Sequence, residues 1–169
     1  MQTPSDESYR LIPLTQGQFA KVDVEDFESL SQHKWFAIWN PHTQSFYAVR
    51  HDNSKPNRPF IQMHRVILGL KPGDRRKGDH ADSGATLDNR RSNLRVASNE
   101  ENGRNARRRR DNWSGFKGVH FRKNLGVWCA RIGVNRRRIH LGHFQTAEEA
   151  AAAYRAAALR LHGSYACFK

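Results

Sequence analysis

The chain has few cysteines and no long apolar segment. Cys129 and Cys167 are the only two cysteines in 169 residues, and they form no C-x-x-C pair. This excludes a disulfide framework and a zinc ribbon, so we expect a reduced protein with no zinc site. No run approaches the ~20 apolar residues that span a bilayer. The first ten residues, MQTPSDESYR, are polar, so we expect a cytoplasmic protein that is neither secreted nor bound to a membrane.

Acidic residues are scarce in the C-terminal part of the chain. Residues 1–102 hold 14 Lys and Arg against 13 Asp and Glu, whereas residues 103–169 hold 15 against 3, for a total net charge of +13. A basic excess confined to one part indicates a nucleic-acid-binding domain there. At this length the chain suits two small domains. Between them lie Arg107, Arg108, Arg109 and Arg110, which predict a linker that contacts phosphates and gives salt-dependent affinity.

The stretch from Gly78 to Asn105 has the spacing of a metal-dependent site. It begins with the Asp79-His80 pair and continues through a turn-rich loop to a strand-like run at residues 93–96. A capping-box pattern from Ser98 to Glu101 then predicts a helix that carries Asn102. Adjacent residues of a strand point to opposite faces. We therefore expect a local irregularity at Asp79-His80 if both serve one site.

These residue types suit hydrolysis of a phosphodiester. A hard divalent cation such as Mg²⁺ prefers oxygen ligands and retains several waters, so one carboxylate and one amide oxygen suffice as protein ligands. Asp79 and Asn102 can supply them. A neighbouring histidine, His80, can activate the attacking water, because its ordinary pKa lies near neutral pH.

The same residues resemble the HNH (ββα-metal) nucleases of the phage homing-endonuclease type. The resemblance rests on Asp79-His80, an Asn-Leu pair 13 residues after the histidine, and Asn102 a further nine residues on. It implies that Asp79 and Asn102 bind Mg²⁺, or alternatively Mn²⁺, and that His80 is the general base. It further implies that Asn93 braces the loop and orients His80.

Two further elements recur in that family. The first is Leu87-Asp88-Asn89-Arg90, which we interpret as loop bracing by Asn89 and Arg90. The second is Met63-His64-Arg65, in which we interpret His64 as structural. Asp79, Asn89 and Asn93 are also common turn formers with local hydrogen bonds. The joint spacing favours the nuclease site over that simpler interpretation.

The remainder of the first domain predicts small strands and short helices. Aromatic and β-branched runs at residues 35–39 and 46–50 predict a hairpin, with strands also expected at 9–14 and 19–22 and a helix at 23–32. Its aromatic residues are expected to form the core rather than a base-stacking platform. From residue 60 the pattern fits both strand and helix, and we favour a helix from about Met63.

The C-terminal part predicts three strands followed by a helix. The strands fall at residues 116–122, 127–134 and 138–144, and a Thr146-to-Glu149 capping box opens a helix that ends near Gly163. Alternation leaves one sheet face free for a DNA major groove. The candidates for base contact are His120, Arg122 and Arg131, and those for phosphate contact are Lys117, Arg136, Arg137 and Arg138.

This part resembles the APETALA2 (ethylene-response-factor-type) DNA-binding domain. The matching stretches are SGFKGV from Ser114, WCARI from Trp128, LGHF from Leu141 and the alanine-rich stretch after Thr146. The resemblance implies a three-stranded sheet that enters the major groove, with a helix behind it. His120 stands where the plant domains often have arginine, so their recognition sequence is not transferred.

Together these patterns predict an α+β chain with two domains. An HNH nuclease domain with a small antiparallel sheet is expected at residues 1–103, with its ββα-metal core at about 77–106. A basic linker follows at 104–113 and the APETALA2-type domain at 114–169. The expected function is a metal-dependent endonuclease that nicks duplex DNA as a monomer or weak dimer. The alternatives are a DNA-binding protein with a vestigial nuclease site, and an RNA binder, which a groove-reading sheet fits less well.

Overall fold

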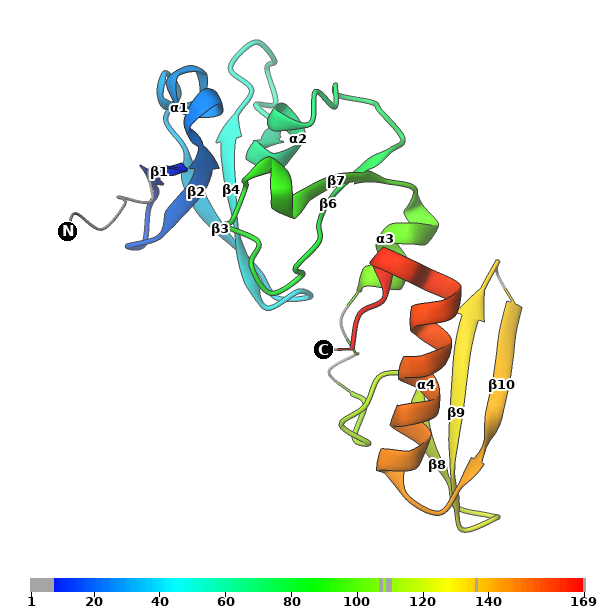
Figure 1. Cartoon of the computed structure of the whole chain (residues 1–169). Coiled ribbons are helices and arrows are strands. Elements are labelled where there is room, and N and C mark those ends of the chain that lie inside the picture. The colour runs from blue at the N-terminus through cyan, green and yellow to red at the C-terminus, as the bar shows by residue number, and fades with distance from the viewer. Residues whose placement is uncertain (1–7, 107, 109–110, 136, 169) are drawn as a thin grey trace, which may run out of the picture. The chain divides into compact units, whose positions relative to one another are not determined.

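The protein consists of two compact units, residues 1–98 and 99–169, in a computed structural model that describes residues 8–106, 108, 111–135 and 137–168 (Figure 1). The first unit ends at Ser98, before the expected domain end at residue 103, so the helix that follows belongs to the second unit. The α+β class expected from the sequence is confirmed. None of the helices within the described residues is long and apolar enough to cross a membrane.

The described residues of the first unit form three small antiparallel sheets. They are β1 (Tyr9–Pro13) with β2 (Phe19–Asp23), β3 (Phe36–Asn40) with β4 (Ser45–His51) and β5 (Phe60–Gln62), and β6 (Lys77–His80) with β7 (Leu94–Ala97). The helices are α1 (Val24–Ser31) and α2 (Met63–Ile67), and the 3-10 turn η1 (Arg91–Asn93) precedes β7. The ambiguous run from residue 60 therefore divides into a short strand and then the helix expected at Met63.

The core of the first unit lies where these sheets and helices meet. Its buried side chains include Val22, Leu30, Trp35 and Met63. Trp35 also donates a hydrogen bond from Nε1 to the Leu30 carbonyl at 2.8 Å, which satisfies its buried polar atom. The expectation that aromatic residues fill this core is confirmed for Trp35, whereas Trp39 is 49% exposed.

The long loop between β6 and β7 is held against the other two sheets. Lys21 in β2 donates its amide to Leu87 O at 2.9 Å and accepts from the Asn89 amide at 2.7 Å. The Thr86 hydroxyl donates to Phe46 O in β4 at 2.6 Å. These contacts fix residues 86–89 although the loop has no strand of its own.

The second unit is a three-stranded antiparallel sheet covered on one face by a helix. Its elements are α3 (Asn99–Asn105), β8 (Val119–Arg122), β9 (Val127–Val134), β10 (Arg137–Phe144), α4 (Ala147–His162) and η2 (Gly163–Tyr165), with sheet order β10-β9-β8. In Figure 1 α4 runs along the sheet. The expected capping box is present, because the Thr146 side chain accepts from the Glu149 amide and Glu149 reaches back to Thr146.

Small residues let α4 lie close to the sheet. Ala150, Ala157 and Ala158 pack on Val119 and Ile132 within the buried cluster. At the entry to β8, an added Cβ on Gly118 would stand only 2.2 Å from the Tyr154 ring and 2.7 Å from a β9 carbonyl. A φ of +75° at Gly118 also favours glycine.

Candidate functional site

The face of the second unit's sheet that points away from α4 is lined with cationic and imidazole side chains. Strand pairing places His120 opposite Cys129, Cys129 opposite His143, and Arg131 opposite His140. Directly opposed residues of an antiparallel pair point to the same face. Because Val119 and Ala130 point into the core, this row points outward. The strand pairing thus agrees with the expected outer face that carries basic residues.

One histidine of this face, His120, gains a proton less readily than a free imidazole. The pKa of His120 is lowered, first by desolvation and then by Arg131, Arg122 and His140. His140 and His143 also lie close together, with ring centroids 4.7 Å apart. A neutral imidazole at His120 can both donate and accept hydrogen bonds, which suits base edges in a DNA groove.

The sequence pattern assigns Cys129 to the same side of its strand as Arg131, but it does not assign His140 or His143 to this face. His140 and His143 are three residues apart and would lie on opposite faces of a regular strand. A register shift between His140 and Gly142 puts both on the outer face. A glycine inside a strand pattern is a signal for such a bulge. Cys129 is a small residue in the middle strand and is fully buried between its neighbours.

Lys117 has a different role from the phosphate contact expected for it. Its ammonium donates to Arg104 O at 2.7 Å and also to Ala106 O. These carbonyls lie at the C-terminal end of α3, where helical carbonyls lack intrahelical partners. Desolvation lowers the pKa of Lys117, in keeping with its partly buried position. Lys117 therefore holds α3 to the sheet.

The other phosphate candidates are exposed or lie outside the description. Arg137 and Arg138 are exposed on β10, where they can reach a phosphate backbone. Arg108 is also exposed and donates to Asn112 O at 3.3 Å. The remaining expected contacts lie outside the described residues: Arg107, Arg109, Arg110 and Arg136.

The model of the AP2 domain family matches residues 114–164. That range covers the whole three-stranded sheet and α4, so the AP2 match and the fold agree. The match implies sequence-specific DNA binding by this part of the chain, and the basic outer face of the sheet is the surface suited to it. No match was found among curated proteins, and none among solved structures.

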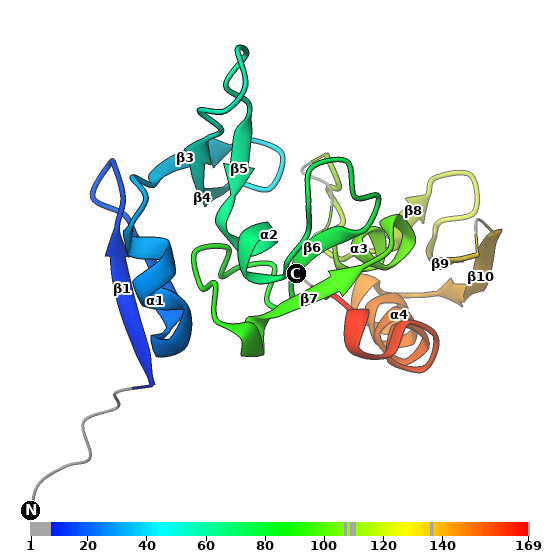
Figure 2. The same ribbon diagram turned by 90° about the horizontal axis from the view of Figure 1, so that it is seen from above.

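In the first unit, β6 and β7 form a hairpin (Figure 2). The Asp79-His80 pair forms the last two residues of β6. Asp79 lies opposite Arg95 and accepts an ion-paired hydrogen bond from its Nε at 2.9 Å. Asp79 and His80 are both buried, with 7% and 4% of their surface exposed. The strand ends at His80, which agrees with the irregularity expected at this point.

His80 is held by an amide and by two neighbouring rings. Its Nε2 lies 3.2 Å from Asn89 Oδ1. An amide oxygen only accepts, so Nε2 carries the proton and the lone pair of the neutral ring is on Nδ1. The ring centroid lies 4.9 Å from that of His64 and 6.1 Å from that of Tyr47. The pKa of His80 is lowered by burial, which outweighs the raising effects of Asn89, Asp79 and Asp88.

His64 is a structural residue behind His80, as expected. It is 4% exposed, and a Cβ at Gly78 would lie 2.5 Å from its Cδ2 atom. Only glycine permits β6 to approach the ring this closely. Burial, with smaller effects of His80 and Arg65, lowers the pKa of His64 to about 3. The neutral ring therefore packs as part of the core.

Asn93 was expected both to brace the loop and to orient His80, but the structure divides these two roles between Asn93 and Asn89. The Asn93 amide donates to Ala85 O at 3.2 Å and Asp88 O at 2.8 Å, and its Oδ1 accepts from the Asp82 amide at 2.9 Å. Asn93 thus braces the loop. The hydrogen bond to His80 comes from Asn89, which is 1% exposed, so its role is larger than the bracing expected for it.

Arg90 and the loop acid Asp88 form a local ion pair. Arg90 Nη2 lies 2.6 Å from Asp88 Oδ2, and the guanidinium lowers the pKa of Asp88. The Asp88 side chain also accepts from the Arg90 amide at 3.3 Å. This pair stabilises the turn that presents Asn89, which agrees with a bracing role for Arg90.

The donor set suits a hard divalent cation in part. Asp79, in the first unit, offers a carboxylate oxygen, which is a ligand type that Mg²⁺ prefers. Asn102, the other expected ligand, is exposed on α3 and belongs to the second unit. Arg95 already balances the charge of Asp79. The one group of three clustered acids in the described part of the chain is Asp23, Glu25 and Asp26. Arg91 bonds to all three of its members, so a cation is already supplied there.

Proposed function

We propose that the chain is a metal-dependent DNA endonuclease of the homing type that nicks one strand of duplex DNA. Its second unit, which carries the AP2 match, directs it to a DNA sequence. Its first unit supplies the cutting site. The observation that carries the nuclease assignment is the held, neutral His80 at the end of β6, beside Asp79 and hydrogen-bonded to Asn89.

In this proposal His80 is the general base. A neutral imidazole can accept a proton from a water through Nδ1, while Asn89 fixes the ring through Nε2. Asn93 keeps the loop that carries Asn89 in place. Asp79 would be the ligand that the first unit supplies to Mg²⁺, or to Mn²⁺ instead. When bound, the cation would stabilise negative charge on the phosphate and on the leaving oxygen.

A single hairpin of this kind gives one cutting site per chain. One site acts on one strand, so a monomer should produce a nick. A double-strand break would require two chains or two successive visits. The product therefore reports how many chains act together.

A second function, DNA binding without cleavage, is favoured by two specific observations. Arg95 is ion-paired to the Asp79 carboxylate, and His80 is only 4% exposed. A general base must reach its water within hydrogen-bond distance. In this case the hairpin would be a structural element and the AP2 match would account for the whole function.

The test is nicking of a supercoiled plasmid that carries a site selected by binding of the full chain. Wild type with Mg²⁺ should yield open circles, whereas His80→Ala and an EDTA control should yield none. His33→Ala, at an exposed histidine of the same unit, is the matched control and should cut normally. Intact plasmid with binding retained would instead support the DNA-binding protein. Linear product without an open-circle stage would show two chains acting together.

A further inference from the structure

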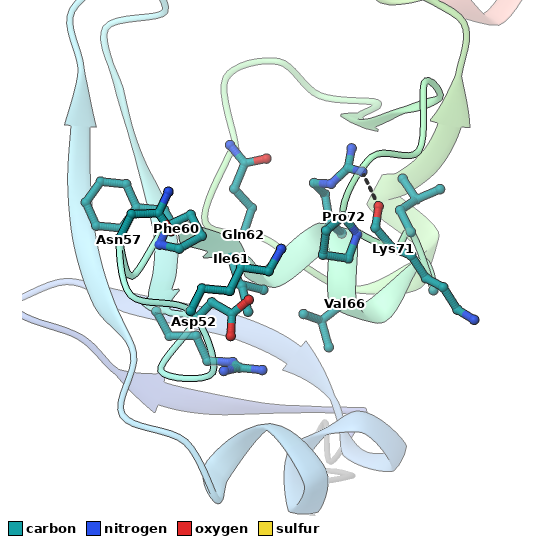
Figure 3. Close-up of a pocket in the computed structure, with 14 residues that line it drawn as sticks. Asp52, Asn57, Phe60, Ile61, Gln62, Val66, Lys71 and Pro72 are labelled. Atoms are coloured by element: carbon teal, nitrogen blue, oxygen red, sulfur yellow. Dashed lines mark hydrogen bonds between the residues drawn. The ribbon is translucent and has the colours of Figure 1, made fainter.

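A hollow of about 670 Å³ lies in the first unit, apart from the β6–β7 hairpin (Figure 3). Residues of the β4–β5 loop, among them Asp52 and Asn57, line one side. Lys71 and Pro72, in the turn after α2, line the other side. Ile61 and Val66, from β5 and α2, lie between them. All of these residues belong to the first unit.

Positive charge is concentrated around this hollow. The lining holds Arg50, Lys55, Arg65 and Lys71 against one acid, Asp52, so its net charge is four minus one, or +3. Residues 1–98 hold 14 Lys and Arg against 11 Asp and Glu, which is also +3. The remainder of the unit is therefore neutral on balance. An anionic ligand is the partner that this distribution fits.

One wall of the hollow is held rigidly by an arginine. Arg65 donates to Arg76 O at 3.2 Å and to Lys71 O at 3.1 Å, and the latter bond is visible in Figure 3. On the other wall, Asp52 is occupied by Ser54, whose hydroxyl lies 2.6 Å from the carboxylate. Lys55 and Lys71 are exposed at the rim. Two exposed ammonium groups in the lining suit phosphates of one strand.

The lining also includes an exposed aromatic side chain. Phe60 is 55% exposed. Its ring centroid lies 5.0 Å from that of His51 and 5.8 Å from that of Phe36, so the ring packs against two neighbouring rings. Val66, 39% exposed, adds further apolar surface. A purely phosphate-binding surface needs no such apolar floor.

We propose that this hollow binds single-stranded DNA, with an unpaired base stacked on Phe60 and the flanking phosphates near Lys55 and Lys71. A positively charged groove with an exposed aromatic ring is the arrangement that binds single strands without sequence preference. In a duplex the faces of the bases are already stacked, so duplex DNA would leave Phe60 without a partner. The hollow thus adds a second nucleic-acid surface, independent of the AP2 segment and of cleavage.

The test measures binding of a fluorescent oligothymidylate by anisotropy, with the full chain in EDTA. Saturating unlabelled duplex that carries the selected site occupies the second unit. Phe60→Ala should weaken binding about 5- to 150-fold, the range for loss of one stacked base. Phe60→Trp should retain it. Lys55→Glu should also weaken binding, and added salt should weaken it for the wild type.

Two matched controls separate the hollow from the general surface. Phe19→Ala removes a ring that is 54% exposed in β2, and Arg10→Glu reverses an exposed charge in β1; neither residue lines the hollow. Both variants should bind like wild type. Equal affinities for Phe60→Ala and Phe19→Ala, with both folded by circular dichroism, would overturn the proposal. Because EDTA removes cleavage, this result is independent of the nicking test.

Discussion

Gly118→Ala should lower the free energy of unfolding of the second unit far more than Gly126→Ala does. Both glycines have positive φ, +75° and +64°, so alanine strains the backbone by about 1–2 kcal/mol at either position. At Gly126 a new Cβ meets no atom of the described residues within 4 Å. At Gly118 it would stand 2.2 Å from Tyr154 Cδ2 and 2.7 Å from Arg131 O. Overpacking of this kind costs a further ~1–3 kcal/mol.

The two variants therefore differ in packing and share the backbone strain. We expect a loss in the free energy of unfolding of about 2–5 kcal/mol for Gly118→Ala, against about 1–2 kcal/mol for Gly126→Ala. Hydrogen exchange of the β9 amides, followed by mass spectrometry in the full chain, reports on the second unit alone. Protection lost equally in the two variants would refute the packing argument. Affinity for DNA should fall with Gly118→Ala, because the Arg131 amide donates to Gly118 O at 2.9 Å.

Three further predictions concern the charged residues. Burial lowers the pKa of His64 from 6.5 to about 3, so the unfolded state binds more protons below pH 6.5. The free energy of unfolding, measured by urea denaturation, should not change with pH above 6.5 and should be about 2 kcal/mol lower at pH 5. Equal values at pH 5 and pH 7 would contradict this prediction. Arg95→Ala should lower the free energy of unfolding of the first unit by about 3 kcal/mol, because it leaves the buried Asp79 carboxylate without its ion pair. The double variant Arg95→Ala, Asp79→Asn should regain most of that stability, as measured by thermal unfolding. In DNA-binding assays, Arg138→Ala should reduce the slope of log K against log salt concentration by about one, as expected for loss of one phosphate contact. Arg131→Ala should instead reduce the discrimination between bases at one base pair by about 1–3 kcal/mol.

Local patterns predicted the order of elements well. The β6–loop–β7–α3 order, the three strands of the second unit and the start of α4 all depend on residues close together in sequence. The strand at β5 was left open because three residues, Phe60–Gln62, are too few to show a period. These three residues form a strand because they pair with β4 at the edge of its sheet.

Long-range contacts account for what the sequence could not show. Asn89 reaches His80 because β2 pairs with the loop at Lys21, more than 60 residues away in sequence. Family spacing pointed to Asn93 for that role. Lys117 was expected to contact phosphate, since nothing local indicates that the end of α3 would supply carbonyl acceptors. Side chains with many possible partners are placed by tertiary structure.

The two units differ in net charge, and this difference bears on which of them brings the chain to duplex DNA. Residues 1–98 hold 14 basic and 11 acidic residues, whereas residues 99–169 hold 15 and 5. Phosphate contacts supply most non-specific affinity for duplex DNA, so the first unit alone should bind duplex weakly. The proposed cutting site, on a weakly charged unit, would then act only where the AP2 segment has already bound. This arrangement would restrict cleavage to the sequence that the second unit reads, without any sequence reading by the first.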